Sequence, residues 1–241
     1  MSMSVAETKT SLADANRILA NEGVLDAFGH VSCRSPLDNG RFFLARSLAP
    51  ELVSPEDILE YDLSSEPVEP TGQALYSERV IHGAIYRARP DVLAICHHHA
   101  GVILPFCLAD LKLRVVTQLG ACIGSSATPI WDQRDGFGAT NHLVTTADQA
   151  QSLAACLGQH PMVLMKRHGA TVVGASLQEL VFRCIYSCRD AELQLKALQY
   201  GEVDAFTDEE IALASRFPEA TLNRAWGYWQ ARLRKREDRA A

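Results

Sequence analysis

The strongest constraint on the fold is a short, wholly apolar run, Val92–Cys96, that leads directly into three histidines, His97, His98 and His99. Five consecutive apolar residues have the length of a strand that is buried on both of its faces. Such a strand needs a covering layer on each side. Together with the helical segments around it, it predicts a layered α/β domain.

Helix and strand signals alternate along the rest of the chain. Further strands are predicted over residues 41–46, 60–63, 162–165 and 170–173. Capping and periodicity signals predict helices over residues 12–22, 74–88, 177–200 and from 208 onward, with a short helical turn at 55–57. Because no internal repeat or linker divides the chain, residues 1–241 are predicted to form one domain.

Charge and composition narrow the class of protein. The 23 Lys and Arg residues against 29 Asp and Glu residues give a net charge of −6, which disfavours binding to nucleic acid. No apolar stretch is long enough to cross a membrane, and the first residues show no apolar signal core, so a cytoplasmic protein is expected. The seven cysteines are an odd number without a Cys-x-x-Cys pair. They are predicted to be reduced, buried thiols.

The three histidines are the sharpest chemical signal. In an extended chain, residues two apart point to the same side, so His97 and His99 are expected to converge while His98 faces away. Two converging imidazoles suit a divalent first-row metal. The alternative at this point is a set of histidines at a strand exit, each with its own hydrogen-bond partner.

Three other residues are candidates for completing such a site. His168 follows the apolar run at 162–165, at a turn from which its side chain can leave the sheet edge. Glu78 and His82 have helical i, i+4 spacing and precede the strand that carries the histidines. A glutamate beside a metal can be a ligand or a proton carrier. The alternative for His168 is a structural histidine in a turn, and the alternative for Glu78 is an exposed carboxylate on a helix.

Several segments, in this order, resemble the class II aldolase/adducin family: Phe28–Arg34, Ser77–Arg79 with His82, Arg89–Asp91, His97-x-His99 and Val163–Gly169. The resemblance implies a three-layer α/β/α fold with a central, mostly antiparallel sheet, and a homotetramer with active sites between subunits. It also implies a divalent metal held by His97, His99 and His168. Glu78 matches the family's acid/base residue, which is also a metal ligand in some members.

The departures from the family pattern indicate the substrate. His30 stands where the sugar-phosphate aldolases have Asn, residues 47–52 lack the glycines that admit a phosphate, and Tyr76-Ser77 replaces a Ser-Ser pair. His30, Arg46 and Ser77 are therefore predicted to bind a small carboxylate substrate, with Arg34 as a further candidate. The alternatives are a hydrogen-bonded loop histidine at position 30 and a surface charge at Arg46.

This pattern is similar to the family branch of hydroxylated aromatic acid decarboxylases, which includes 3-hydroxy-2-methylpyridine-4,5-dicarboxylate decarboxylase. The resemblance implies decarboxylation through a metal-stabilised enolate or phenolate, with Glu78 handling the proton. Mn²⁺ or Zn²⁺ is expected, and Fe²⁺ is a third option. Rival hypotheses are a retro-aldolase acting on a non-phosphorylated hydroxy-keto acid, a non-haem iron oxygenase and an adducin-type interaction module. Trp226, Tyr228 and Trp229 either cover a neighbouring subunit's site or pack on their own domain.

Overall fold

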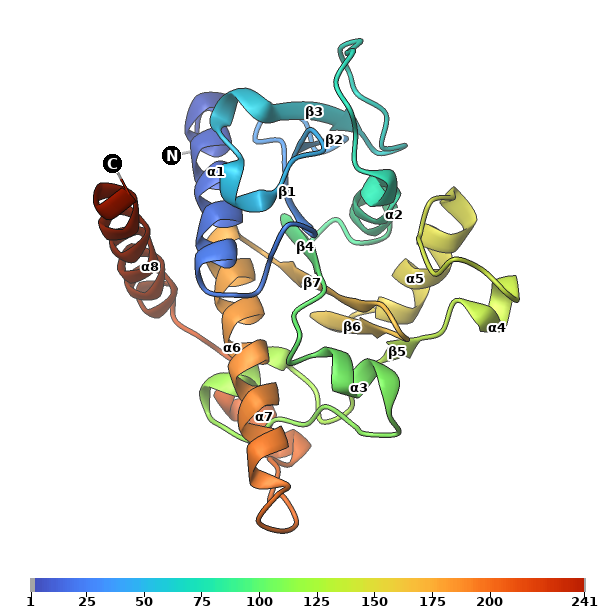
Figure 1. Cartoon of the computed structure of the whole chain (residues 1–241), viewed down its shortest axis with the longest axis vertical. Coiled ribbons are helices and arrows are strands. Elements are labelled where there is room, and N and C mark those ends of the chain that lie inside the picture. The colour runs from blue at the N-terminus through green and yellow to red at the C-terminus, as the bar shows by residue number, and fades with distance from the viewer. Residues whose placement is uncertain (1–2, 241) are drawn as a thin grey trace.

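A central sheet organises the computed structural model, which describes residues 3–240 (Figure 1). Within these residues the sheet has seven strands in the order β3-β2-β1-β4-β7-β6-β5. Neighbouring strands pair antiparallel except β5 and β6, which are parallel. The strands are β1 (His30–Arg34), β2 (Arg41–Ala45), β3 (Ile58–Asp62), β4 (Ala94–His98), β5 (Ile130–Trp131), β6 (Met162–Met165) and β7 (Gly169–Gly174).

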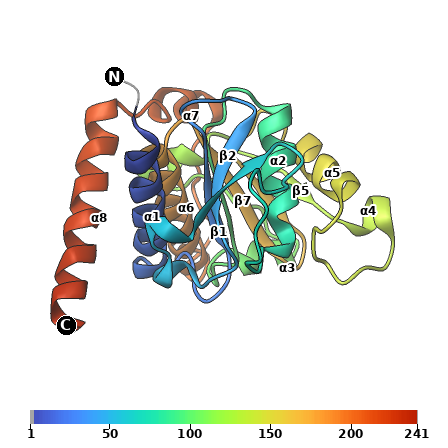
Figure 2. The ribbon, with the colours of Figure 1, turned by 90° about the horizontal axis from the view of Figure 1, so that it is seen from above.

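Helices cover both faces of this sheet. Figure 2 shows α1 (Val5–Asn21) and α6 (Leu177–Ala197) on one face and α2 (Val80–Ala88) and α5 (Ala147–Leu157) on the other. Helix α8 (Glu219–Ala240) lies outside α1 and α6. The remaining helical elements are α3 (Leu104–Leu108), α4 (Arg134–Phe137), α7 (Asp208–Ala214), η1 (Pro50–Leu52), η2 (Pro55–Asp57), η3 (Ser77–Arg79) and η4 (Leu119–Ile123). The predicted three-layer α/β/α fold is confirmed.

Strand β4 shows why its sequence is apolar without alternation. Ala94 and Cys96 belong to the core beneath α1 and α6, whereas Ile95 belongs to the core beneath α2 and α5. Side chains of a strand alternate between faces, and both faces are buried here. The strand begins at Ala94, two residues later than predicted, and Leu93 is 43% exposed. The shift brings His97 and His98 into the sheet.

Two helix starts differ from their predictions. Helix α1 begins at Val5 rather than after Ser11, because Ser4 and Glu7 form a complete capping box. The segment predicted as one helix over 74–88 is divided: residues 77–79 form the 3₁₀ turn η3, and α2 begins at Val80. Glu78 lies in this turn with φ −94° and ψ 15°. Its side chain is therefore not on the regular face of α2.

Some elements were missed from the sequence. Helix α5 was not predicted, although Thr146 and Gln149 form a complete capping box at its start. At the start of α6, the Ser176 side chain accepts a hydrogen bond from the amide of Glu179. The Glu179 carboxylate accepts from the amide of Ala175 and not from that of Ser176, so the capping box is incomplete.

The described helices include none long and apolar enough to cross a membrane. The single domain over residues 1–241 stays a prediction.

The C-terminal aromatic residues have separate environments. Trp226 and Trp229 are buried in the core between α8 and the rest of this chain. Tyr228 is exposed, and the Arg232 guanidinium lies 5.7 Å from its ring centre. The two tryptophans therefore pack on their own chain.

Candidate metal centre and active site

Three histidines meet where β4 and the β6–β7 hairpin end. His97 lies on β4, His99 follows it, and His168 lies in the turn before Gly169. The Nε2 atoms of His97 and His99 are 3.0 Å apart, and the ring centres of His97 and His168 are 4.9 Å apart. His98 points elsewhere and accepts a hydrogen bond from Ala100 N at Nδ1. The two-residue repeat of an extended chain thus brings His97 and His99 together, as predicted.

Two glycines let the neighbouring backbone approach this strand. A Cβ at Gly169 would lie 2.3 Å from the carbonyl oxygen of His98. Gly29 has φ +89°, and a Cβ there would lie 2.8 Å from the carbonyl oxygen of His97. Only glycine fits such close approaches without displacing the backbone. Both residues therefore help to place the histidines.

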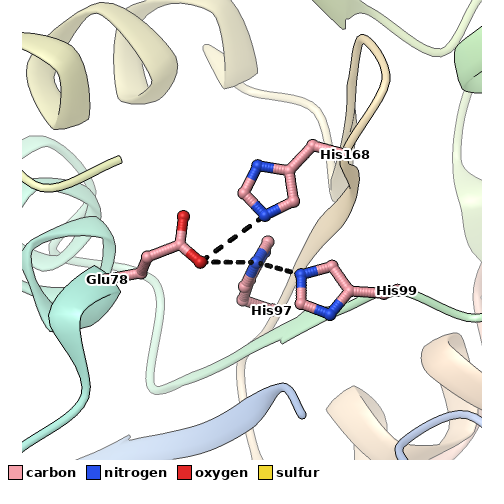
Figure 3. A group of neighbouring side chains, drawn as sticks. All are labelled: Glu78, His97, His99 and His168. Carbon is pink, nitrogen blue, oxygen red and sulfur yellow. Dashed lines mark hydrogen bonds and ion pairs between the residues drawn. The ribbon is translucent and has the colours of Figure 1, made fainter. Parts of the chain in front are cut away.

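Glu78 faces the histidines from the opposite side (Figure 3). Its Oε2 is 3.6 Å from His97 Nε2 and 3.5 Å from His168 Nε2. Its Oε1 accepts a hydrogen bond of 2.9 Å from the amide of Val144. The side chain is buried, so one oxygen is anchored and the other is directed at the imidazoles.

The donor set fits a divalent first-row ion. The ligand atoms of Glu78, His97, His99 and His168 all lie within 4.8 Å of one another. Ligands about 2.1 Å from a shared tetrahedral ion are about 3.4 Å apart, close to the distances seen here. The carbonyl oxygen of Ala170, 3.1 Å from His97 Nδ1, can only accept a hydrogen bond, so that nitrogen carries the hydrogen. The lone pair of His97 Nε2 is therefore available to a metal.

Electrostatics favour the protonation states that metal ligands need. Burial, and then the neighbouring His97 and His168, lower the pKa of His99 to about 4. Burial acts to raise the pKa of Glu78, but hydrogen bonds with His168 and His97 outweigh it and hold that pKa well below its usual range. At neutral pH, His99 is therefore neutral and Glu78 is a carboxylate, as ligation requires.

A cavity of about 680 Å³ opens beside these residues. This volume is within the range of small-molecule sites. Its walls comprise Ala27, Phe28, Gly29, His30, Ser47, Leu48, Ala49, Tyr76, Ser77, Glu78, His99, Leu143 and His168. Two of the predicted substrate residues, His30 and Ser77, are thus on the cavity wall. Burial, and then His82 and His97, lower the pKa of His30 well below its usual range, so its ring is neutral.

Other candidates lie away from the cavity. The Arg46 Nε is 2.7 Å from Asp57 Oδ1, and Arg46 is not among the described residues of the cavity wall. Binding of substrate by Arg46 therefore stays a prediction, and it requires the guanidinium to leave Asp57. Arg34 donates to backbone oxygens, including those of Val92 and Tyr86. Its guanidinium is thus already hydrogen-bonded to the backbone within the fold.

Sequence reasoning missed parts of the site. The amide of Val144 anchors Glu78 across 66 positions of sequence, and no sequence signal marks a backbone donor. Phe28 and Leu143 contribute apolar wall. Phe28 stands beside the Gly29-His30 pair, and 70% of its surface is exposed. The sequence carries no signal for this wall, because single exposed apolar side chains such as Leu37 and Leu213 also lie elsewhere on the surface.

Comparisons with known proteins show which family the chain belongs to. Residues 10–195 match the family described as class II aldolase and adducin N-terminal domain. The chain is 31% identical to decarboxylase tropJ of Talaromyces stipitatus over 88% of each chain. It is 28% identical to 3,4-dihydroxyphthalate decarboxylase of Terrabacter sp., over 97% of this chain and 100% of that protein. The solved L-fuculose 1-phosphate aldolase of Glaciozyma antarctica superposes with a TM-score of 0.78 at 23% identity, covering 97% of this chain and 91% of that one. The chain therefore belongs to the class II aldolase and adducin N-terminal domain family.

Proposed function

We propose that this carbon–carbon lyase is a decarboxylase of a hydroxylated aromatic or heteroaromatic acid. The observation that carries the proposal is the convergence of one carboxylate and three imidazoles beside the cavity. Two similar proteins named as decarboxylases, one of them a 3,4-dihydroxyphthalate decarboxylase, support the reaction and the substrate class. The apolar wall, with Phe28, Leu48 and Leu143, suits a planar ring.

We propose that His97, His99, His168 and Glu78 hold a divalent ion, Mn²⁺ or Zn²⁺, with Fe²⁺ as a third option. When bound, the ion supplies a Lewis acid that stabilises negative charge on an oxygen next to the reacting carbon. The chain's own contribution is to orient the substrate and to move a proton. His30 and Ser77 would contact the substrate from the cavity wall.

Glu78 is the proposed proton carrier. Because Oε1 is occupied by the Val144 amide, both proposed roles of Glu78 use Oε2. Oε2 takes the proton of the substrate's ring hydroxyl. Oε2 then gives this proton to the ring carbon that bears the carboxylate. The bond between that carbon and the carboxylate breaks, CO₂ leaves, and the electron pair of the bond restores the aromatic ring with the negative charge on the oxygen. The product oxyanion regains a proton from water on release.

The test is mass spectrometry of anaerobic reactions with Mn²⁺-loaded protein. The substrates are a panel of ortho-hydroxy aromatic acids and hydroxy-keto acids. Loss of one CO₂ from an aromatic acid, abolished in Glu78→Gln and retained in Glu60→Gln, is the expected result. Cleavage of a hydroxy-keto acid into two carbonyl fragments would replace the proposal with a retro-aldolase. In a parallel aerobic reaction with Fe²⁺-loaded protein, turnover that needs both Fe²⁺ and O₂ would replace it with an oxygenase.

We also propose a homotetramer in the cytoplasm that acts on small molecules without nucleic-acid or membrane partners. Net negative charge and the lack of a membrane-spanning helix among the described residues support the choice of partners. Light scattering on the purified protein measures the assembly. A monomer would contradict this part of the proposal.

A further inference from the structure

A row of polar side chains runs from the cavity wall into the space between β1 and α2. His30 Nδ1 is 2.7 Å from His82 Nε2, and His82 Nδ1 is 2.5 Å from Ser32 Oγ. Ser32 Oγ is 2.9 Å from the Tyr86 hydroxyl. All four residues are buried, and His30 is the one on the cavity wall.

Two backbone periods build this row. His30 and Ser32 are two apart on β1 and share a face of the strand, whereas His82 and Tyr86 are one helical turn apart on α2. The strand and the helix therefore present alternating members of one continuous hydrogen-bonded row. The metal-centre residues do not belong to it.

Tyr86, at the far end of the row, determines the direction in which the hydrogen bonds of the row are donated. Within residues 3–240, Ser32 Oγ is the only hydrogen-bond partner of the Tyr86 hydroxyl. To avoid a buried, unpaired hydrogen, the phenol must donate to Ser32, and Ser32 must then donate to His82 Nδ1. His82 consequently carries its hydrogen on Nε2 and donates to His30 Nδ1. The hydrogen of the neutral His30 ring is then on Nε2.

The opposite direction of donation, from His30 toward Tyr86, is disfavoured. It would leave the Tyr86 hydrogen buried without an acceptor, a penalty that corresponds to a preference of about tenfold or more. Burial raises the pKa of Tyr86 well above its usual range and lowers the pKa of His82 to about 3. Both groups are therefore neutral at physiological pH, and the row has defined donors and acceptors.

We infer that Tyr86, Ser32 and His82 are positioning residues that hold His30 as the Nε2–H tautomer, a hydrogen-bond donor toward an oxyanion of the substrate. The inference rests on the proposed function for the identity of the substrate as an acid. Among the described residues, the cavity wall contains neither Lys nor Arg. Hydrogen bonds from the cavity wall to the acid therefore come from neutral donors. His30 is one of them, because the row leaves its Nε2 with a hydrogen to donate.

The direct test reads the tautomer by ¹⁵N NMR. The full chain, loaded with Zn²⁺ and labelled at its histidine ring nitrogens, is measured without substrate, and His30→Gln identifies the His30 signals by their loss. The expected pattern has a protonated Nε2 and an unprotonated Nδ1. In Tyr86→Phe, the signals of the two nitrogens move toward each other as both tautomers become populated. Tyr61→Phe is the matched control, because the Tyr61 hydroxyl is buried without a partner.

A wild-type His30 protonated at Nδ1 would overturn the inference, as would a His30 pattern unchanged by Tyr86→Phe. If Tyr86→Phe does not fold, the wild-type pattern and Ser32→Ala decide the question. In the decarboxylation assay, Tyr86→Phe should raise KM about twofold with little change in kcat, because the donor tautomer of His30 is then only about half populated. Because the NMR measurement needs no turnover, failure of the proposed function leaves the tautomer result standing.

Discussion

Replacing Glu78 by Gln separates the two roles proposed for this residue. The amide keeps a carbonyl oxygen that can still accept from the Val144 amide, so the local backbone is retained. At the other position an NH₂ group replaces Oε2, which is 3.6 Å from His97 Nε2 and 3.5 Å from His168 Nε2. A donor thus stands where both a metal and a proton need an acceptor.

The expected magnitudes follow from that geometry. Three imidazoles remain, so the ion should stay bound, with a Kd raised about 10- to 100-fold, or about 1.4 to 2.8 kcal/mol. Loss of the proton carrier should lower kcat about 10²- to 10⁴-fold even at saturating metal. The unfolding free energy of the metal-free protein should fall at neutral pH, because the hydrogen bonds that hold the pKa of Glu78 below its usual range stabilise the carboxylate in the folded state.

Metal affinity is measured by competition with a chelating dye, and kcat by release of CO₂ at saturating metal. Glu60→Gln on β3 is the matched control, because it removes the same charge from a carboxylate that lies beside Arg41 and outside the cavity wall. Wild-type kcat in metal-saturated Glu78→Gln would refute the proton role. Wild-type Kd would refute the ligand role, and the two results are independent.

Three further predictions test the site and its surroundings. Gly169→Ala should lower the unfolding free energy by about 1 to 3 kcal/mol in urea titrations, because the new Cβ would lie 2.3 Å from the His98 carbonyl oxygen. Gly101→Ala, where no atom lies within 4 Å, should leave it nearly unchanged, and equal losses would contradict the reasoning. Burial lowers the pKa of His82 from 6.5 to about 3, so between these values the unfolded chain binds a proton that the folded chain does not. Stability of the metal-free protein should therefore fall as pH decreases from 6.5, and urea titrations at pH 7 and pH 5 should show a smaller fall in His82→Gln; an equal fall would argue against this origin. In steady-state kinetics, His30→Gln should raise KM about five- to tenfold, whereas Arg46→Gln should change it less than about twofold. An equal rise for Arg46→Gln would show that its guanidinium leaves Asp57 to bind substrate.

Local periodicity accounts for much of what the sequence predicted. The apolar run before His97 indicated a strand buried on both faces, and β4 divides its side chains between the two cores. The two-residue period placed His97 and His99 on one side. The end of α1 also followed from a local signal, since Gly23 has φ +74° just beyond the helix. The start of α1 was missed because Ser4 and Glu7 hold a stronger capping signal than Ser11.

Side-chain partners distant in sequence were beyond such reasoning. The residue types predicted that Arg46 could bind a carboxylate, but they could not show that η2 brings Asp57 to within 2.7 Å of it. The i, i+4 spacing of Glu78 and His82 predicted a shared face. The 3₁₀ turn instead directs Glu78 to the histidines, whereas His82 contacts His30 and Ser32.

The sequence by itself determined the kinds of element, the family pattern and the ligand types, because backbone geometry repeats every two or about 3.6 residues and leaves its period in the chain. Only the tertiary structure decided which distant group each buried polar side chain has as its hydrogen-bond partner. Val144, for example, anchors Glu78 from 66 positions away. Such pairings depend on how separate elements pack, and a buried polar group takes whichever partner that packing brings within hydrogen-bond distance.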